Sequence, residues 1–401
     1  MRILHTSDWH LGASLEGVSR HPEHAAFLAW LREILDEREV DVLLVSGDVF
    51  DGPQPAAEAQ RLYYDFLANV ASSRVRRTIV VGGNHDSPSR LEAPSEVLRS
   101  LSVHVVGGYD SRQPGDLVFP IPGDDGRVAA VVLGVPFVHE MRLGISTTAA
   151  DQATVQEQFR TRFAGLYRML ADLAERDFGS VPVVATGHLT AGCADRRDYP
   201  YEIHQVGSLG SLPASIFDPR LCYVALGHIH RRYRVQQSRA YYSGSPLPIL
   251  LAEANRPHGV LLYELGGAEP EFIRVPLTRA LVHLSGNESD LVAALSRLSW
   301  SEPCPPLVFL ELLVDRYDPG ALERLEQRLG TGPARIVSLR QRIPELGTPS
   351  SLPAETLGEL EPEAVFRLLC ERKGARLDDD LLAAFRDVLD EARSGAEARG
   401  A

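Results

Sequence analysis

The sequence predicts an α/β protein, on three observations. Apolar runs rich in Val, Ile and Leu recur along the first 230 residues, as in strands that are buried on both faces. Amphipathic helical patterns lie between these runs, and strands that alternate with helices are typical of α/β domains. Each run also ends in a polar cluster, as expected where buried strands open into functional loops.

Five of these runs are expected to form the central strands. Their β-branched composition suits a pleated, buried surface, and the carboxyl ends of such strands are where sites assemble in α/β sheets. In chain order they are Ile3-Leu4, Val42 to Val45, Thr78 to Val81, Val181 to Ala185 and Leu221 to Leu226.

Three helices are expected between the strands. Pro22 suits a first helical position, because its fixed φ fits a helix and its missing N–H is not needed there. The residues that follow repeat at i, i+3 and i+4, which predicts a buried face made of Phe27, Trp30, Leu31, Ile34 and Leu35. Further amphipathic helices are predicted at Ala56 to Ala71 and at Gln152 to Arg176.

The pattern changes near residue 280, so residues 1–280 are expected to form one catalytic domain. A strand at Leu307 to Val314, a helix at Pro319 to Leu329 and a strand at Arg335 to Leu339 predict a small β-α-β capping domain, residues 281–342. Residues 343–362 are rich in Pro, Gly, Ser and Glu, as in linkers. Residues 363–401 hold two helical patterns, Glu363 to Lys373 and Asp378 to Ser394.

Composition narrows the class of protein. No apolar run is long enough to span a bilayer, and no basic and apolar leader precedes the first strand, so a cytoplasmic location is expected. The four cysteines form no C-x-x-C pair, which argues against a disulfide framework and a zinc ribbon. The net charge of -13 argues against tight nucleic-acid binding by this chain alone, although bound metals or a partner could supply positive charge.

The polar clusters together predict a metal site. Carboxylates, an amide and imidazoles without thiolates suit Mn²⁺, Mg²⁺, Fe or Zn²⁺. Strand alternation is expected to point the first two donors to one face. Seven donors are too many for one ion, so two ions about 3.5–4 Å apart are expected. The candidate ligands are Asp8, His10, Asp48, Asn84, His188, His228 and His230.

Two of the polar residues are expected to have particular roles. Two ions need a bridging carboxylate, and Asp48 is the better candidate because Asp8 is already paired with His10. His85 follows Asn84 directly but is not needed to fill the two coordination shells. It is therefore predicted to be the catalytic histidine, which protonates the leaving oxygen or stabilises developing negative charge.

The motif series D-x-H, G-D-x-x-D, G-N-H-D, G-H and G-H-x-H resembles the calcineurin-like metallophosphoesterase superfamily. Within this superfamily, the residues in and around these motifs resemble those of the SbcD family of DNA double-strand-break repair nucleases. The segments that carry this resemblance are TSDWHLG at 6–12, SGDVFD at 46–51, GNHDSP at 83–88, TGHLT at 186–190, GHIH at 227–230 and YSGSP at 242–246.

This resemblance implies a fold, an activity and a set of ligands. The fold would be a double β-sandwich flanked by helices, and the activities would be a duplex 3'→5' exonuclease and a single-strand or hairpin endonuclease. Two Mn²⁺ ions per chain are implied, with Mg²⁺ or other divalent ions as alternatives. One ion would be held by Asp8, His10, Asp48 and His230, and the other by Asp48, Asn84, His188 and His228.

The resemblance also implies partners. The chain would form a homodimer, act on DNA ends and hairpins, and bind an SbcC-type coiled-coil ATPase without any membrane association. The helices at 363–401 would grip the base of that coiled coil, or else pack back on the main domain. Archaeal relatives carry a second catalytic histidine where this chain has Asp51, so the role of Asp51 stays open.

Alternative functions remain for the same motifs. Phosphoprotein phosphatases carry Arg after G-D-x-x-D and Glu after G-N-H, whereas this chain has Gly52 and Asp86. A nucleotide or cyclic-nucleotide phosphodiesterase is harder to exclude, although such enzymes rarely need a linker and a terminal helix pair. A DNA-end scaffold with a decayed site is disfavoured because every ligand position is occupied.

Overall fold

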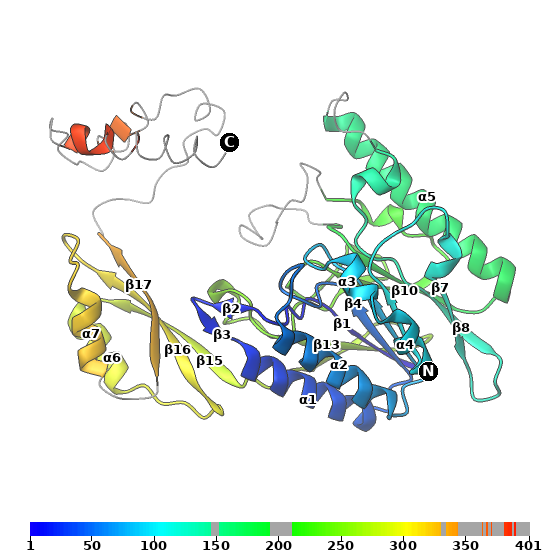
Figure 1. Cartoon of the computed structure of the whole chain (residues 1–401), viewed down its shortest axis with the longest axis horizontal. Helices are drawn as coiled ribbons and strands as arrows, with labels where there is room; N and C mark the ends of the chain where they lie inside the picture. The colour runs from blue at the N-terminus through cyan, green and yellow to red at the C-terminus, as the bar shows by residue number, and fades with distance from the viewer. Residues whose placement is uncertain are drawn as a thin grey trace. The chain divides into compact units, whose positions relative to one another are not determined.

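The computed structural model describes residues 1–145, 152–192, 211–329 and 334–343, with helical residues 363, 366–367, 370, 381–386 and 389 (Figure 1). The described chain forms two compact units. The first contains two large sheets, and the second contains helices α6 and α7. No helix among the described residues is long and apolar enough to cross a membrane.

The first sheet has six strands in the order β14-β13-β1-β4-β5-β6. Its parallel strands run from β1 to β6, and β13 pairs with β1 in the antiparallel direction. Three of the expected strands, those that begin near residues 3, 42 and 78, are therefore neighbours here. The bounds are β1 Arg2–Thr6, β4 Val42–Ser46, β5 Arg77–Val81, β6 Val103–Val106, β13 Gly259–Glu264 and β14 Glu271–Arg274.

The second sheet also has six strands, in the order β11-β12-β10-β9-β8-β7. The two remaining expected strands, β9 and β10, lie side by side and parallel at its centre. A strand after residue 181 is confirmed, but it continues through Gly187 and His188 and does not stop before them. The bounds are β7 Val118–Pro122, β8 Val128–Leu133, β9 Val183–His188, β10 Leu221–Gly227, β11 Tyr233–Arg234 and β12 Ala240–Tyr242.

The two sheets pack face to face, with helices outside, which confirms the double sandwich that the resemblance implied. Alternate residues of one strand face opposite ways: Leu44 joins the core between the sheets, while Leu43 and Val45 join the core beneath the helices. Burial on both faces explains why these strands are apolar throughout.

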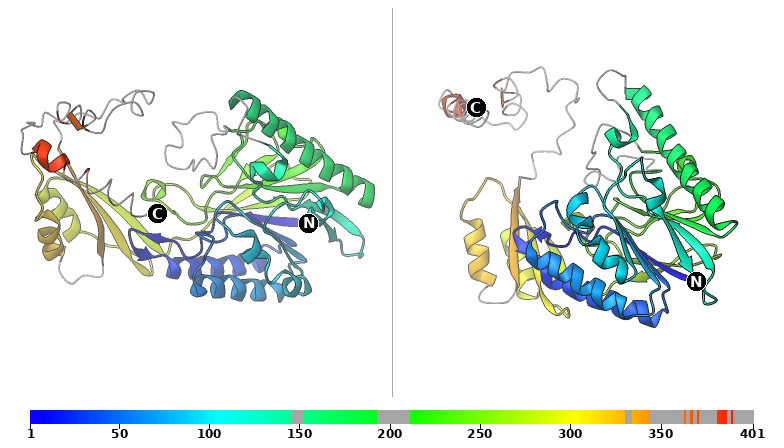
Figure 2. Two further views of the ribbon diagram at one scale, coloured as in Figure 1. Left: turned by 45° about the horizontal axis from the view of Figure 1, so that its top comes forward. Right: turned by 45° about the vertical axis from the view of Figure 1, so that its right-hand side comes forward.

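All three expected helices are present. Helices α1 (His21–Glu37) and α2 (Ala57–Ala71) lie side by side against the first sheet, and Pro22 lies in the first turn of α1 (Figure 2). Helix α5 (Gln152–Phe178) covers the second sheet. The smaller elements are the hairpin β2 (Ser14–Leu15) and β3 (Val18–Ser19), helices α3 (Pro88–Glu92) and α4 (Ser95–Ser100), and 3-10 turns η1 (Pro114–Leu117), η2 (Glu140–Leu143), η4 (Ala214–Ile216) and η5 (Leu251–Glu253).

The C-terminal region contains more than the β-α-β pattern expected from the sequence. Strands β15 (Arg279–Gly286), β16 (Cys304–Leu313) and β17 (Arg335–Arg342) form a sheet, with α6 (Glu288–Ser296) and α7 (Ala321–Leu329) between them. The bond from Cys304 N to Thr278 O joins the start of β16 to the start of β15. The bond from Val314 N to Arg342 O joins the end of β16 to the end of β17, so both pairs run parallel. Residues 344–362 and most of the expected terminal helices lie outside the described residues.

The first strand and helix of this region were missed because β15 is broken by polar residues and α6 is short. A capping signal was nevertheless present in the sequence. The Asn287 side chain accepts from Asp290 N, and the Asp290 side chain accepts in return from Asn287 N. This reciprocal pair is the capping box that marks a helix start.

Trp9 ties the turn after β1 to the helical layer. The side chain is fully buried, and its Nε1 donates to Thr6 Oγ1 at 2.9 Å. Its ring makes edge contacts with Phe27 of α1 at 5.9 Å and with Phe66 of α2 at 5.5 Å between centroids. The turn that carries Asp8 and His10 is therefore held in place by the aromatic packing of Trp9 against α1 and α2.

We expect Trp9→Ala to lower the free energy of unfolding by about 3–5 kcal/mol, because it leaves a large cavity in this core. Urea unfolding measures the change. Trp30→Ala is the matched control, since Trp30 is only half-buried and should cost less. Equal losses for the two variants would contradict the anchoring role of Trp9.

Candidate metal centre

The structure brings the ends of five strands from both sheets to one place. Asp8 and His10 follow β1, Asp48 follows β4, and Asn84 and His85 follow β5 of the first sheet, while the second sheet supplies His188, the last residue of β9, and His228 and His230 after β10. Ligand atoms lie within 4.8 Å of one another in three groups: Asp8, His10 and His230; His10, Asp48 and His85; and Asp8, Asp48 and His188.

The expectation that strand alternation points Asp8 and His10 to one face was wrong. Asp8 and His10 lie beyond the end of β1, so strand alternation does not direct them. Both take left-handed backbone conformations, with φ of 54° and 47°. Asp48 and His228 are likewise at positive φ, 49° and 94°. Such conformations are costly for residues other than glycine and gather at functional sites, so tight turns and not strands aim these side chains.

Glycines beside the ligands allow the two sheets to meet. A Cβ at Gly47 would overlap the ring of His188, and one at Gly83 would overlap the carboxylate of Asp48. A Cβ at Gly227 would overlap the Ser46 carbonyl. Backbone therefore approaches side chain and backbone here more closely than any other residue type would permit.

The site fixes the orientation of His188. Its Nδ1 donates to the Ser46 carbonyl at 2.8 Å, so Nε2 faces the site. That Nε2 lies 3.3 Å from Asp48 Oδ2 and 3.0 Å from Asn84 Oδ1. Asn84 Oδ1 also lies 2.9 Å from His228 Nδ1, so the amide oxygen stands between two imidazoles.

Glu253 is a functional candidate that sequence reasoning missed. Its side chain is 1% exposed, and Oε1 lies 3.0 Å from His230 Nδ1. Its other oxygen accepts from Ile249 N at 2.7 Å and from Leu250 N at 3.2 Å. A buried carboxylate on the far nitrogen of an imidazole is the usual way to orient a metal-binding histidine.

Asp51 contacts two histidines of the site. Its Oδ1 lies 3.2 Å from His10 Nδ1, and its carbonyl lies 3.0 Å from His85 Nδ1. The other His10 nitrogen, Nε2, is buried without a hydrogen-bond partner among the described residues, 3.7 Å from Asp48 Oδ2. A buried nitrogen of this kind is costly unless something binds it, so it fits a metal ion.

Asp86 holds the loops together and does not face the metal centre. Its oxygens accept from Val49 N, Phe50 N and Gly83 N at 3.1, 2.9 and 2.9 Å. Burial raises the pKa of this carboxyl, and the charge of Asp48 adds to the rise. Asp86 thus joins the loop after β4 to the loop after β5.

The site concentrates opposite charges in a buried volume. Burial alone would raise the pKa of Asp48, but the imidazoles of His188 and His10 hold it far below its usual range. Burial would lower the pKa of His188, yet Asp48 raises it to about 9. The pKa of His230 is also raised to about 9 against the effect of burial, by Glu253 and Asp8. Protons on these rings provide positive charge that a bound cation would replace.

The donors therefore fit divalent cations of intermediate hardness. Asp48 lies in two of the three groups of ligand atoms, between the His10 side and the His188 side. His85 also belongs to one group, and its backbone N–H donates to Asp48 Oδ1 at 2.9 Å. Proximity alone leaves His85 available either as a ligand or as a group that acts on substrate.

Comparison with known proteins agrees with this arrangement. The calcineurin-like phosphoesterase family matches residues 1–232, and the type 5 capsule protein repressor C-terminal domain matches residues 277–373. The chain is 38% identical to the SbcD component of nuclease SbcCD from Rhodobacter capsulatus over 384 residues, 91% of this chain and 93% of the relative. It is 31% identical to the same component from Escherichia coli K12 over 91% of this chain and 92% of the relative. For Bacillus subtilis the identity is 31% over 66% of each chain.

A match to the phosphoesterase family over more than half of the chain, with its donors gathered at the strand ends, defines a metal-dependent phosphoesterase with a divalent-metal site. The resemblance of the motifs is thereby confirmed. Within this class, the chain belongs to the SbcD family of nuclease subunits.

Glu253→Gln tests the orienting contact to His230. We expect a loss of about 10–100-fold in Mn²⁺ affinity, because the neutral amide keeps the shape but no longer supports the imidazole with charge. Isothermal titration calorimetry of the metal-free chain measures the affinity. Glu264→Gln, at an exposed position, is the control. Unchanged Mn²⁺ affinity in Glu253→Gln would show that the contact does not support metal binding.

Proposed function

We propose that this chain is a Mn²⁺-dependent DNA nuclease that degrades duplex ends in the 3'→5' direction and cuts single strands and hairpins. The convergence of carboxylate, amide and imidazole groups from five strand ends supports the proposal most strongly. Family membership and near full-length coverage of the Rhodobacter and Escherichia nuclease subunits add to it. A role on chromosomal DNA would place the chain in the cytoplasm.

The same residues are proposed to hold two ions. Asp8, His10, Asp48 and His230 would bind one, and Asp48, Asn84, His188 and His228 the other. Asp48 Oδ2 lies 3.7 Å from His10 Nε2 and 3.3 Å from His188 Nε2, which suits a carboxylate that serves both sets. Mn²⁺ is proposed because mixed oxygen and imidazole donors suit it, and Mg²⁺ is the alternative.

When bound, the divalent ions supply Lewis acidity and an activated water for in-line displacement at phosphorus. His85 is proposed to act on the leaving oxygen. The Asp51 carbonyl accepts from its Nδ1 at 3.0 Å, which fixes the ring, and Nε2 is the nitrogen proposed to transfer the proton. Asp51 also contacts His10 at 3.2 Å, so one residue orients both rings.

Partners are proposed from the family and from the C-terminal residues. Rings of Phe366 and Phe385 stack at 4.1 Å between centroids, and Glu363 pairs with Arg367 at 2.8 Å and Arg386 at 2.9 Å. These contacts suit two paired helices at 363–401 that bind an SbcC-type ATPase. We retain the division into a nuclease domain, capping domain, linker and ATPase-binding helices as part of this proposal.

A homodimer is also proposed. Val97 and Leu101 lie one turn apart on and just beyond α4, and they are 67% and 39% exposed. Two large apolar side chains on one exposed helical face suit a contact between copies of the chain.

Metal binding and catalysis should separate in two variants. Asp48→Asn should lose at least one bound metal per chain and all cleavage of labelled hairpin DNA, because it removes the shared charge. His85→Ala should keep its metal content, with turnover lower by about 10²–10⁴. Elemental analysis and initial rates measure the two effects.

Full metal occupancy in Asp48→Asn would exclude the bridging role, and metal loss in His85→Ala would make His85 a ligand. Hydrolysis of bis-p-nitrophenyl phosphate is measured beside the hairpin. Cleavage of the small ester alone by the unmodified chain would favour a nucleotide phosphodiesterase and contradict the nuclease proposal.

Truncation after Ile343 tests the role of the tail. This cut keeps all of β17, which runs to Arg342. A cut at Leu339, where the strand predicted from the sequence ends, would remove the last part of β17. The truncated chain should still cleave short single strands with Mn²⁺, since every proposed ligand precedes residue 231. It should lose ATP-stimulated degradation of duplex ends. Undiminished co-purification of the truncated chain with the SbcC-type ATPase would show that these helices do not bind the ATPase, and would favour their packing on the main domain.

A further inference from the structure

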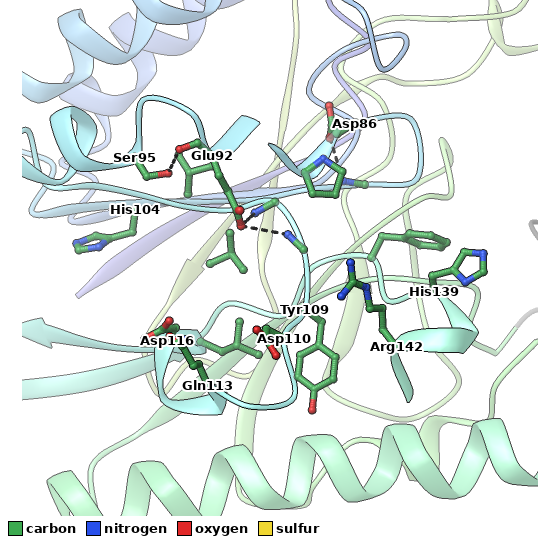
Figure 3. Close-up of a pocket in the computed structure, with 18 of the residues that line it drawn as sticks. Asp86, Glu92, Ser95, His104, Tyr109, Asp110, Gln113, Asp116, His139 and Arg142 are labelled. Carbon is green, nitrogen blue, oxygen red and sulfur yellow. Dashed lines mark hydrogen bonds between the residues drawn. The ribbon is translucent and has the colours of Figure 1, made fainter. Parts of the chain in front are cut away.

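A pocket of about 720 Å³ opens beside the metal centre, along edge strand β6 (Figure 3). Asn84 and Phe137 line the end nearest the metal centre, and the Phe137 ring packs edge-on against His188 at 6.3 Å between centroids. Tyr109 and Arg142 also line this pocket. The pocket thus extends from Asn84, a proposed ligand of the second ion, along β6.

A second pocket of about 850 Å³ continues along α5, and it shares Tyr109 and Arg142 with the first. We call the two together the Tyr109–Arg142 groove. Each pocket alone has the volume of a site for one small ligand. A continuous pair therefore suits an extended ligand that begins at the metal centre.

Three arginines line the groove without a bonded partner among the described residues. Arg99 and Arg142 line the first pocket and Arg162 the second. All three are exposed, and their guanidinium groups make no hydrogen bond or ion pair within the part of the chain that the structure describes. On a chain with a net charge of -13, three unpaired arginines along one groove mark a place for an anionic ligand.

Most groove carboxylates are already engaged. Glu92 accepts from Gly107 N at 2.7 Å and Gly108 N at 3.3 Å, contacts that Figure 3 draws. Asp110 is bound by Arg112 at 2.9 Å, and Glu157 is paired with Arg160. Asp86 accepts from three backbone N–H groups, which leaves the Asp116 side chain as the one groove carboxylate without a hydrogen bond or ion pair among the described residues. With the pairs Asp110–Arg112 and Glu157–Arg160 set aside, the groove carries Asp86, Glu92 and Asp116 against Arg99, Arg142 and Arg162, so its charges balance, and these three arginines are the cations left to bind an anionic ligand.

The groove also offers a ring and an unmet polar atom. Tyr109 is half-buried, and Figure 3 shows its ring beside Arg142. His104 Nε2 is buried without a hydrogen-bond partner among the described residues. Burial, with Arg77 and Arg99 nearby, lowers the pKa of His104 to about 4, so its ring adds no positive charge at neutral pH.

We propose that the Tyr109–Arg142 groove binds single-stranded nucleic acid leaving the metal centre, with phosphates on Arg99, Arg142 and Arg162 and a base stacked on Tyr109. Grooves that combine cationic side chains with aromatic platforms bind single strands in this way. Bases of a duplex are stacked on each other and cannot use such a ring. This inference rests on the proposed nuclease function and assigns the path of its substrate.

The test uses the full chain, a fluorescent 12-nucleotide oligothymidylate and the variants Arg142→Gln and Tyr109→Leu. Anisotropy in EDTA reports binding without cleavage. Tyr109→Leu should weaken binding at least about fivefold. Arg142→Gln should reduce the slope of log affinity against log salt by about 0.7. Arg127→Gln, which is 90% exposed on the turn between β7 and β8, removes the same charge outside the groove and should change neither.

With Mn²⁺ added, the ratio of oligonucleotide cleavage to bis-p-nitrophenyl phosphate hydrolysis should fall at least about fivefold in both groove variants and stay constant in Arg127→Gln. Constant binding and an unchanged ratio in the groove variants, with oligonucleotide still cleaved, would overturn the groove alone. If the unmodified chain hydrolyses the ester but no oligonucleotide, the nuclease function fails and the groove with it.

Discussion

The close approach of the two sheets at their carboxyl ends is the constraint on which the site depends. The Ser46 carbonyl at the end of β4 accepts from His188 Nδ1 at the end of β9, at 2.8 Å. Gly47 and Gly227 make the approach possible, because a side chain at either position would occupy the space of the partner sheet. The donors come from both sheets, so a small separation of the sheets would pull the donor set apart.

Strained turns at the strand ends convert this approach into a site. Asp8, His10, Asp48 and His228 all have positive φ, and conformations of this kind cost of order 1–3 kcal/mol each. Backbone bonds between the loops hold them: Asp8 N donates to Gly47 O at 2.9 Å, and His10 N donates to Asp48 O at 3.1 Å. His228 N donates to Asp8 Oδ1 at 2.9 Å, which joins the sheets again. The surrounding fold therefore supplies the free energy that keeps these side chains aimed inward.

The sequence predicted what has a local signature. Apolar strands that end in Asp, Asn or His, and a helix that begins at Pro22, are visible in short windows. Glu253 was missed because it lies in a 3-10 turn, 23 residues after its partner His230, and no local periodicity marks it. The division of five strands between two sheets was equally invisible, since pairing is set by contacts far apart in the chain. The left-handed turns at Asp8 and His10 were also not predicted, because bonds to Gly47 and Asp48, far away in the chain, hold them.

Uneven distribution of charge reconciles an acidic chain with a polyanionic substrate. An ionic strength of 0.15 M screens exposed charges that lie more than about 8 Å from the site. Within the site, the protonated imidazoles of His188 and His230 lie beside carboxylates, and divalent cations that displace those protons make the local charge more positive. Beside it, the Asp110 carboxylate is paired with Arg112, while the Arg142 guanidinium has no hydrogen bond or ion pair in the part of the chain that the structure describes. The potential that a phosphodiester meets is thus set by the charges close to the site, and not by the net charge of the whole chain.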